Sequence, residues 1–155
     1  MLFVIPAKAG IQPYKNPRLI IWAAVSLFAL DRWLKYLAVE RAPACAGPVS
    51  FSLYLNHGLA FSLLLAPVVF WFSMIIGVIA LTWAIVRHVR LYRRWPLALI
   101  VVALGALSNL LDRLFGGAVI DYLLFFCWSA INFADVMIAG GLLWAVLEEN
   151  CHPRA

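Results

Sequence analysis

Four apolar stretches dominate this sequence, and each is long enough to form a helix that crosses a lipid bilayer. A transmembrane helix needs about 20 mostly apolar residues to cross a hydrocarbon core about 30 Å thick. The stretches cover residues 19–39, 66–86, 96–115 and 131–147. Of the 155 residues, 66% are apolar and 12% are charged, and a soluble domain of this size cannot bury so much apolar surface. The sequence therefore predicts an all-α polytopic membrane protein with four transmembrane helices.

Basic residues predict the orientation of these helices. They gather before the first stretch and between the second and third: Lys8, Lys15, Arg18, Arg87, Arg90, Arg93 and Arg94. Because cytoplasmic loops are enriched in Lys and Arg, we expect both termini in the cytoplasm and residues 40–65 and 116–130 on the outer side. This pattern accounts for the net charge of +5, so we expect membrane lipids and no nucleic acid as partners. Residues 49–55 begin with alternating polar and apolar side chains, which indicates a short extracytoplasmic β segment.

The rest of the chain suggests one domain with two tails. Residues 1–17 contain several Pro and Gly residues and no sustained period, so we expect a flexible N-terminal tail. Residues 18–148 then form the membrane domain, and residues 149–155 form a C-terminal tail. The cysteines Cys45, Cys127 and Cys151 are too scattered for a CxxC pair, a zinc site or a disulfide framework. We interpret them as ordinary small apolar residues, with Cys127 as a packed thiol.

The acidic residues are few, and most are predicted to lie on one side of the membrane. Glu148 and Glu149 follow the last stretch, whereas the other five fall in the outer half or the outer segments: Asp31, Glu40, Asp112, Asp121 and Asp135. A charge in hydrocarbon costs at least about 2.5 to 3.5 kcal/mol, so such residues face a protein interior or water and are commonly functional. The four aspartates are therefore candidate site residues.

Helical spacing groups these acids with other polar residues. Asp31 and Lys35 are four positions apart and share a helix face, as do Asn132 and Asp135 at a spacing of three. A third group joins Asn109, Asp112 and Arg113. For Asp31 and Lys35 an internal ion pair that only holds the bundle together is an equal alternative. On the outer side four cations face five acids, so at least one carboxyl group is expected to lack a cationic partner.

Two neighbouring carboxyl groups are sufficient for hydrolysis of a peptide bond. They cannot both ionise easily, so one retains a proton while the other acts as a base toward a water molecule. This chemistry requires no metal and no cofactor, and we predict neither. Other hydrolytic motifs are missing from the sequence, since His57, His88 and His152 lack HExxH or HxxEH spacing and no Gly-x-Ser-x-Gly segment occurs. We interpret His57 as a solvated loop residue.

Five motifs in order give the sequence a family resemblance. They are Asp31-Arg-Trp-Leu-Lys35, Asn56-His-Gly58-Leu-Ala60-Phe61-Ser62, Gly105-Ala-Leu-Ser-Asn109-Leu-Leu-Asp112-Arg113, Val119-Ile-Asp121-Tyr and Asn132-Phe-Ala-Asp135. Each motif is weak by itself, but the ordered set over residues 19–147 closely resembles the bacterial lipoprotein signal peptidases, or signal peptidase II.

The resemblance implies an intramembrane aspartic endopeptidase of the bacterial cytoplasmic membrane, with its active site toward the outer side. Such an enzyme removes the signal peptide from diacylglyceryl-modified prolipoproteins just before the lipidated cysteine. The positions that match the catalytic pair are Asp121 and Asp135. Supporting or substrate-binding positions are implied at Asp31, Lys35, Asn56, Gly58, Asn109, Arg113 and Asn132. Residues 48–62 correspond to the family's outer strand segment, which would cradle the substrate.

The chain also departs from the family pattern. Arg32 and Leu34 alter the first motif, Ser108 replaces a usual Gly, and Ala130 and Ile131 stand where Pro and an aromatic residue are common; we expect these changes to weaken supporting contacts. The 14 positions from Asp121 to Asp135 are expected to be several fewer than usual, which should shorten the outer segment and alter substrate gating.

These departures keep two alternatives open. One is a non-catalytic family member that binds lipidated signal peptides. The other is a small ion channel or proton-linked carrier, because membrane-embedded carboxyl groups commonly line ion paths. The channel is disfavoured because the second stretch carries no acidic residue and the aspartates are predicted to lie on one side.

Overall fold

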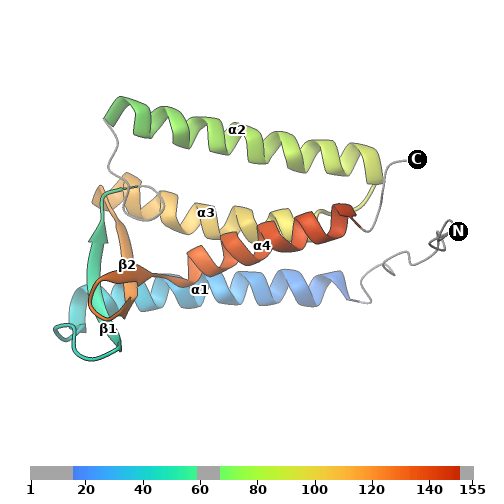
Figure 1. Cartoon of the computed structure of the whole chain (residues 1–155). Coiled ribbons are helices and arrows are strands. Elements are labelled where there is room, and N and C mark those ends of the chain that lie inside the picture. Colours follow the sequence, from blue (N-terminus) through green and yellow to red (C-terminus); the bar gives the residue numbers. More distant parts are fainter. Residues whose placement is uncertain (1–15, 59–66, 151–155) are drawn as a thin grey trace, which may run out of the picture.

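A computed structural model describes residues 16–58 and 67–150 of the chain (Figure 1). Most of both predicted tails lies outside these residues, so the tails stay predictions. Cys151 also lies outside them, as do the last residues of the second motif, Leu59, Ala60, Phe61 and Ser62.

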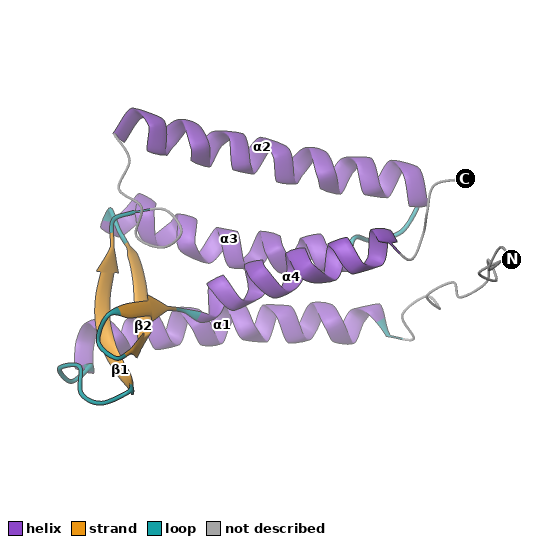
Figure 2. Ribbon diagram, in the orientation of Figure 1, coloured by secondary structure: helices purple, strands orange, loops and turns teal. Residues whose placement is uncertain are grey.

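Four helices and a small sheet make up the described structure. In chain order the elements are α1 (Pro17–Arg41), β1 (Val49–Asn56), α2 (Pro67–Tyr92), α3 (Leu97–Gly116), β2 (Val119–Phe125), β3 (Ser129–Ile131) and α4 (Phe133–Asn150). The helices run roughly along one direction, and the sheet lies at the end of the bundle away from the last turn of α4 (Figures 1 and 2). The predicted helical architecture with a small β segment is confirmed.

Two of the helices are long and apolar enough to span a membrane by composition alone: Trp71–Tyr92 and Leu97–Gly116. The helix α1 has 25 residues, but it contains Asp31, Arg32 and Lys35. The helix α4 has 18 residues and carries Asp135 in its first turn. The predicted number of four crossings and the cytoplasmic location of the termini stay predictions.

Lipid is the environment that suits the outer surface of the bundle. Large apolar side chains are exposed along the helices; Trp22, Ile79 and Leu143 are 69%, 62% and 61% exposed. None of the apolar stretch of α2 is buried. Exposure of so much apolar surface to water would be unfavourable, whereas hydrocarbon solvates it.

The helices α3 and α4 approach each other closely through glycines. A Cβ atom on Gly105 would lie 2.6 Å from the carbonyl oxygen of Ala134, and one on Gly141 would lie 2.7 Å from Cγ2 of Val102. Small residues allow the backbones of membrane helices to come together. This contact brings the start of α4, with Asp135, against the polar residues of α3.

The sheet is antiparallel, with strand order β1-β2-β3. The pairing of β1 with β2 runs from Val49 opposite Phe125 to Asn56 opposite Val119, with an irregularity between Phe51 and Tyr54. The short strand predicted at residues 49–55 is therefore confirmed. The strands β2 and β3 form a tight hairpin in the segment that leads from Asp121 to α4.

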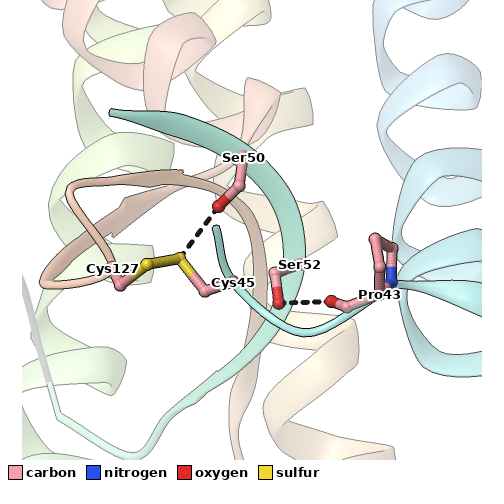
Figure 3. Close-up of a disulfide and its surroundings, with 5 residues drawn as sticks. All are labelled: Pro43, Cys45, Ser50, Ser52 and Cys127. Carbon is pink, nitrogen blue, oxygen red and sulfur yellow. Dashed lines mark hydrogen bonds between the residues drawn. A yellow bond between two sulfur atoms is a disulfide. The ribbon is translucent and has the colours of Figure 1, made fainter. Parts of the chain in front are cut away.

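A disulfide joins Cys45 to Cys127, so the prediction of three ordinary apolar cysteines is wrong for these two residues. Their Cα atoms are 5.7 Å apart although 82 positions separate them in the sequence. The physical reason is the antiparallel pairing, which brings the residues before β1 next to the turn after β2. Figure 3 shows the bond together with Ser50, whose Oγ lies 2.9 Å from Sγ of Cys45. Distance along the chain therefore gave no information about this contact.

Candidate active site

Asp135 is held by the N-terminal cap of α4. Asn132 immediately precedes the helix, and its Oδ1 accepts a hydrogen bond of 2.9 Å from the backbone N–H of Asp135. In return, Oδ2 of Asp135 accepts a hydrogen bond of 3.2 Å from the backbone N–H of Asn132. This reciprocal pattern is a capping box. A carboxylate at this position is also stabilised by the positive end of the helix dipole.

Asp121 lies on β2 and is 1% exposed. One of its oxygens, Oδ1, accepts a hydrogen bond of 2.5 Å from Nδ2 of Asn132, and Oδ2 accepts one of 3.2 Å from Nδ2 of Asn56. Burial, followed by the nearby charge of Asp135, raises the pKa of Asp121 to about 6. Asp121 therefore keeps its proton to a higher pH than an ordinary aspartate does.

Asn109 of α3 connects Asp135 with a buried lysine. Its Nδ2 donates a hydrogen bond of 2.8 Å to Oδ1 of Asp135. Its Oδ1 accepts from Nζ of Lys35 at 2.8 Å and from Nδ2 of Asn132 at 3.2 Å. Because an ammonium group can only donate, Lys35 fixes the amide of Asn109 with its NH₂ group toward Asp135.

Lys35 itself belongs to a buried ion cluster between α1 and α3. Its Nζ lies 3.2 Å from Oδ2 of Asp31 and 2.7 Å from Oδ2 of Asp112, and all three side chains are fully buried. The guanidinium group of Arg32 forms a further ion pair with Asp112. Two cations thus balance two carboxylates. The ion pair between Asp31 and Lys35 is present, and the alternative that it only holds the bundle together stays a prediction.

Sequence reasoning missed two members of this cluster, Tyr122 and Ser108. The hydroxyl of Tyr122 donates to Oδ1 of Asp31 at 2.8 Å and accepts from the backbone N–H of Phe133 at 2.9 Å. Ser108 donates from Oγ to Oδ2 of Asp31 at 2.6 Å. In the sequence, Tyr122 stood only as the last residue of the motif Val119-Ile-Asp121-Tyr, with no role assigned to it.

The unusual residues of the first and third motifs form contacts here. Arg32 pairs with Asp112, and Ser108 binds Asp31. Arg32 and Ser108 thus make contacts of their own in the cluster, and the expected weakening relative to the family pattern stays a prediction. The sequence alone does not reveal these contacts, because the partner of each residue lies on another helix.

The remaining predicted positions lie beside Asp121. Gly58 donates its backbone N–H to Oδ1 of Asn56 at 3.0 Å, and its carbonyl oxygen accepts from Arg113 at 3.1 Å. The charge of Arg113 interacts with both Asp121 and Asp135. His57, by contrast, is exposed, as predicted. The structure therefore brings together all the site residues predicted from the sequence.

Two aspartates lie at one end of an apolar helical bundle, and Asn132 binds one through its side chain and the other through its backbone. They define a membrane protein with a carboxyl pair suited to acid and base chemistry. No group of three His, Cys, Asp or Glu residues that could hold a metal occurs within residues 16–58 and 67–150. Residues 23–150 match the family model of signal peptidase (SPase) II. The chain belongs to this family of membrane peptidases.

Curated relatives agree with this family, and a solved structure has a similar fold. The lipoprotein signal peptidase of Azoarcus sp. (strain BH72) is 33% identical over 153 residues, which cover 88% of this chain and 85% of the relative. That of Desulfitobacterium hafniense (strain DSM 10664 / DCB-2) is 33% identical over 142 residues, with 83% and 93% covered. A bacterial membrane enzyme solved by the in meso method at 2.3 Å resolution has a similar fold, with a TM-score of 0.66, 22% identity and coverage of 88% and 92%.

Proposed function

We propose that this protein is an aspartic endopeptidase that removes the signal peptide from diacylglyceryl-modified prolipoproteins, just before the lipidated cysteine. Asp121 and Asp135 form the catalytic pair. The observation that carries this proposal is the position of Asn132, which binds Asp121 through its side chain and Asp135 through its backbone. Residues far apart in the fold could not share this one residue as a partner.

The two carboxyl groups have different environments, which suggests different roles. Asp135 is half-buried and accepts hydrogen bonds from Asn109 and from the backbone of Asn132, so we assign it the role of the base. It takes a proton from water, and the water oxygen forms a bond to the scissile carbonyl carbon. Asp121 gives its proton to the carbonyl oxygen, which becomes a hydroxyl group. When the C–N bond breaks, Asp135 returns its proton to the leaving nitrogen, and the hydroxyl proton returns to Asp121.

The proposed site faces the outer side of the bacterial cytoplasmic membrane. Disulfides persist in oxidising compartments, and the Cys45–Cys127 bond lies in the sheet that carries Asp121. The basic residues at the end of α2, including Arg90 in its last turn, support a cytoplasmic location for the opposite end. Both lines of argument give the same orientation.

Four crossings are compatible with the helix lengths. At 1.5 Å per residue, the 25 residues of α1 extend about 37 Å and the 18 residues of α4 extend about 27 Å. The buried charges Asp31 and Lys35 of α1 neutralise each other inside the bundle. Because the acids of the cluster gather at one end instead of lining a path across, the bundle does not suit the alternative of an ion channel.

Purified protein with a lipidated prolipoprotein tests the proposal directly. We expect cleavage to give a product that begins with the lipidated cysteine, identified by mass spectrometry, and no cleavage of the same precursor without its diacylglyceryl group. Binding without hydrolysis would support the non-catalytic alternative instead. Cleavage of both precursors at equal rates would contradict the proposed substrate class.

The pKa of Asp121 predicts how activity depends on pH. The proposed mechanism requires Asp121 to be protonated, and its pKa is raised to about 6. As pH rises through this value the proton is lost, so kcat/KM should fall about tenfold per pH unit on the alkaline side. A kcat/KM profile that is flat from pH 6 to 9 would contradict this assignment.

The variant Asn56→Ala provides a signed check on the pH profile. The hydrogen bond from Asn56 lowers the pKa of Asp121, so its removal should shift the alkaline inflection to higher pH. A shift to lower pH would show that another group titrates.

A further inference from the structure

The strands that hold Asp121 in place are not joined by a tight turn. β1 and β2 pair with each other, yet α2 and α3 lie between them in the sequence. In a β hairpin the turn determines which residues face each other across the strands. For β1 and β2, another feature of the molecule must determine which residues face each other.

The pairing of β1 with β2 contains an irregularity, which weakens its control of the register. Phe51 faces Leu123, whereas Tyr54 faces Asp121, so β1 has one residue more than β2 between these two pairs. Such an extra residue is a β-bulge, which locally disrupts the ladder of hydrogen bonds. The interrupted ladder alone therefore does not fix the register, and a constraint at one end of the strand pair is needed to hold it.

The disulfide closes the strand pair at the end away from Asp121. It joins residues just beyond the pair of Val49 with Phe125. Next to it, the backbone N–H of Phe126 donates to the carbonyl oxygen of Pro48 at 2.9 Å. Figure 3 shows the bond connecting the turn after β2 to the segment before β1. It occupies the place that a turn would have in a hairpin.

A change of register would remove Asp121 from the site. A shift of one residue would point its side chain to the opposite face of the sheet, and a shift of two would move it by about 7 Å. Either shift would break the hydrogen bonds from Asn56 and Asn132 to Asp121. A disulfide requires Cα atoms within about 4.4 to 6.8 Å of each other, so it opposes both shifts.

We propose that Cys45 and Cys127 are positioning residues, whose disulfide sets the register of β1 against β2 and so places Asp121 for reaction. This inference rests on the proposed peptidase function. The chain therefore becomes fully active only after the sheet has reached an oxidising compartment, and a reductant that opens the disulfide lowers its activity.

The test compares Cys45→Ser/Cys127→Ser with its parent in a Cys151→Ser background, which leaves no other thiol. We expect kcat for the lipidated precursor to fall at least tenfold, with KM changed less than threefold, because Asp121 moves while the helices remain. The alkaline inflection of the pH profile should move lower, since Asp121 loses the effect of Asp135. The parent treated with a reductant should behave in the same way.

A relocated disulfide separates positioning from general stability. Val49 and Phe125 are paired across the strands, so Val49→Cys/Phe125→Cys, added to the double serine variant, should restore register at the same end. We expect at least half of the lost kcat to return on oxidation and to disappear again on reduction. Failure of this rescue, with the new bond verified by mass spectrometry, would overturn the inference.

The remaining outcomes distinguish this inference from the proposed function. If the double serine variant keeps the kcat and pH profile of its parent, the positioning role is refuted and the peptidase function stands. If the parent cleaves no precursor, the proposed function fails, and hydrogen exchange of residues 119–125 decides the inference. Exchange at least tenfold faster without the disulfide supports a role in register, and unchanged exchange overturns it.

Discussion

Replacing Asp121 or Asp135 with Asn should reduce cleavage of a lipidated prolipoprotein by at least about 10³-fold, as removal of a central catalytic group commonly does. An amide has nearly the shape of a carboxyl group, but it can neither accept a proton from water nor return one. The measurement is kcat/KM of purified variants. Because the two groups act as a unit, Asp121→Asn/Asp135→Asn should be hardly slower than either single variant.

The matched control for these variants is Glu40→Gln, which makes the same change at an exposed acid at the end of α1. It should keep the activity of the unmodified protein. Thermal unfolding should confirm that the Asn variants remain folded. Cleavage within tenfold of normal in either Asn variant would exclude Asp121 and Asp135 as the catalytic pair.

Replacing Lys35 with Met should strongly destabilise the fold. Lys35 contacts Asp31 and Asp112, and all three side chains are fully buried. Removal of the cation leaves buried negative charge without compensation, a change that costs about 3 to 5 kcal/mol in other proteins. The free energy of unfolding in detergent is the measurement. Activity should also fall, because Asn109 loses the donor that orients its amide.

A double variant tests whether lost charge balance is the cause. Lys35→Met/Asp112→Asn removes one charge of each sign, so it should be less destabilised than the sum of the two single variants. Arg18→Gln, at an exposed position at the start of α1, is the control and should unfold like the original protein. Additive effects of the two substitutions, or a Lys35→Met variant as stable as the control, would contradict this account.

Helices were the part of the fold that local sequence could predict. The apolar stretch 96–115 nearly coincides with α3, whereas α2 continues to Tyr92, six residues beyond the stretch 66–86. Arg87 and Arg90 end the apolar pattern but not the helix, because helical hydrogen bonds join backbone groups and do not require apolar side chains. Apolar length therefore predicts where a helix crosses hydrocarbon better than where it ends.

The candidate site was predictable in its members but not in its connections. Spacing placed Asn132 and Asp135 on one face, and the structure links them through a cap. The contact of Tyr122 with Asp31 and the Cys45–Cys127 disulfide join residues remote in sequence. Such contacts depend on how the strands pair and how the helices pack, which neither spacing nor composition specifies.

Neutral amides donate hydrogen bonds to the two aspartates, Lys35 stands one layer behind them, and the charge of Arg113 acts on both. The donors described for Asp121 and Asp135 belong to Asn56, Asn109 and Asn132, and an amide binds a carboxylate without cancelling its charge. An inhibitor that presents an uncharged hydroxyl group or a cation to this pair should consequently bind better than an otherwise identical compound bearing a carboxylate. The amides around the two aspartates thus determine which charge the central group of an inhibitor of this protein should carry.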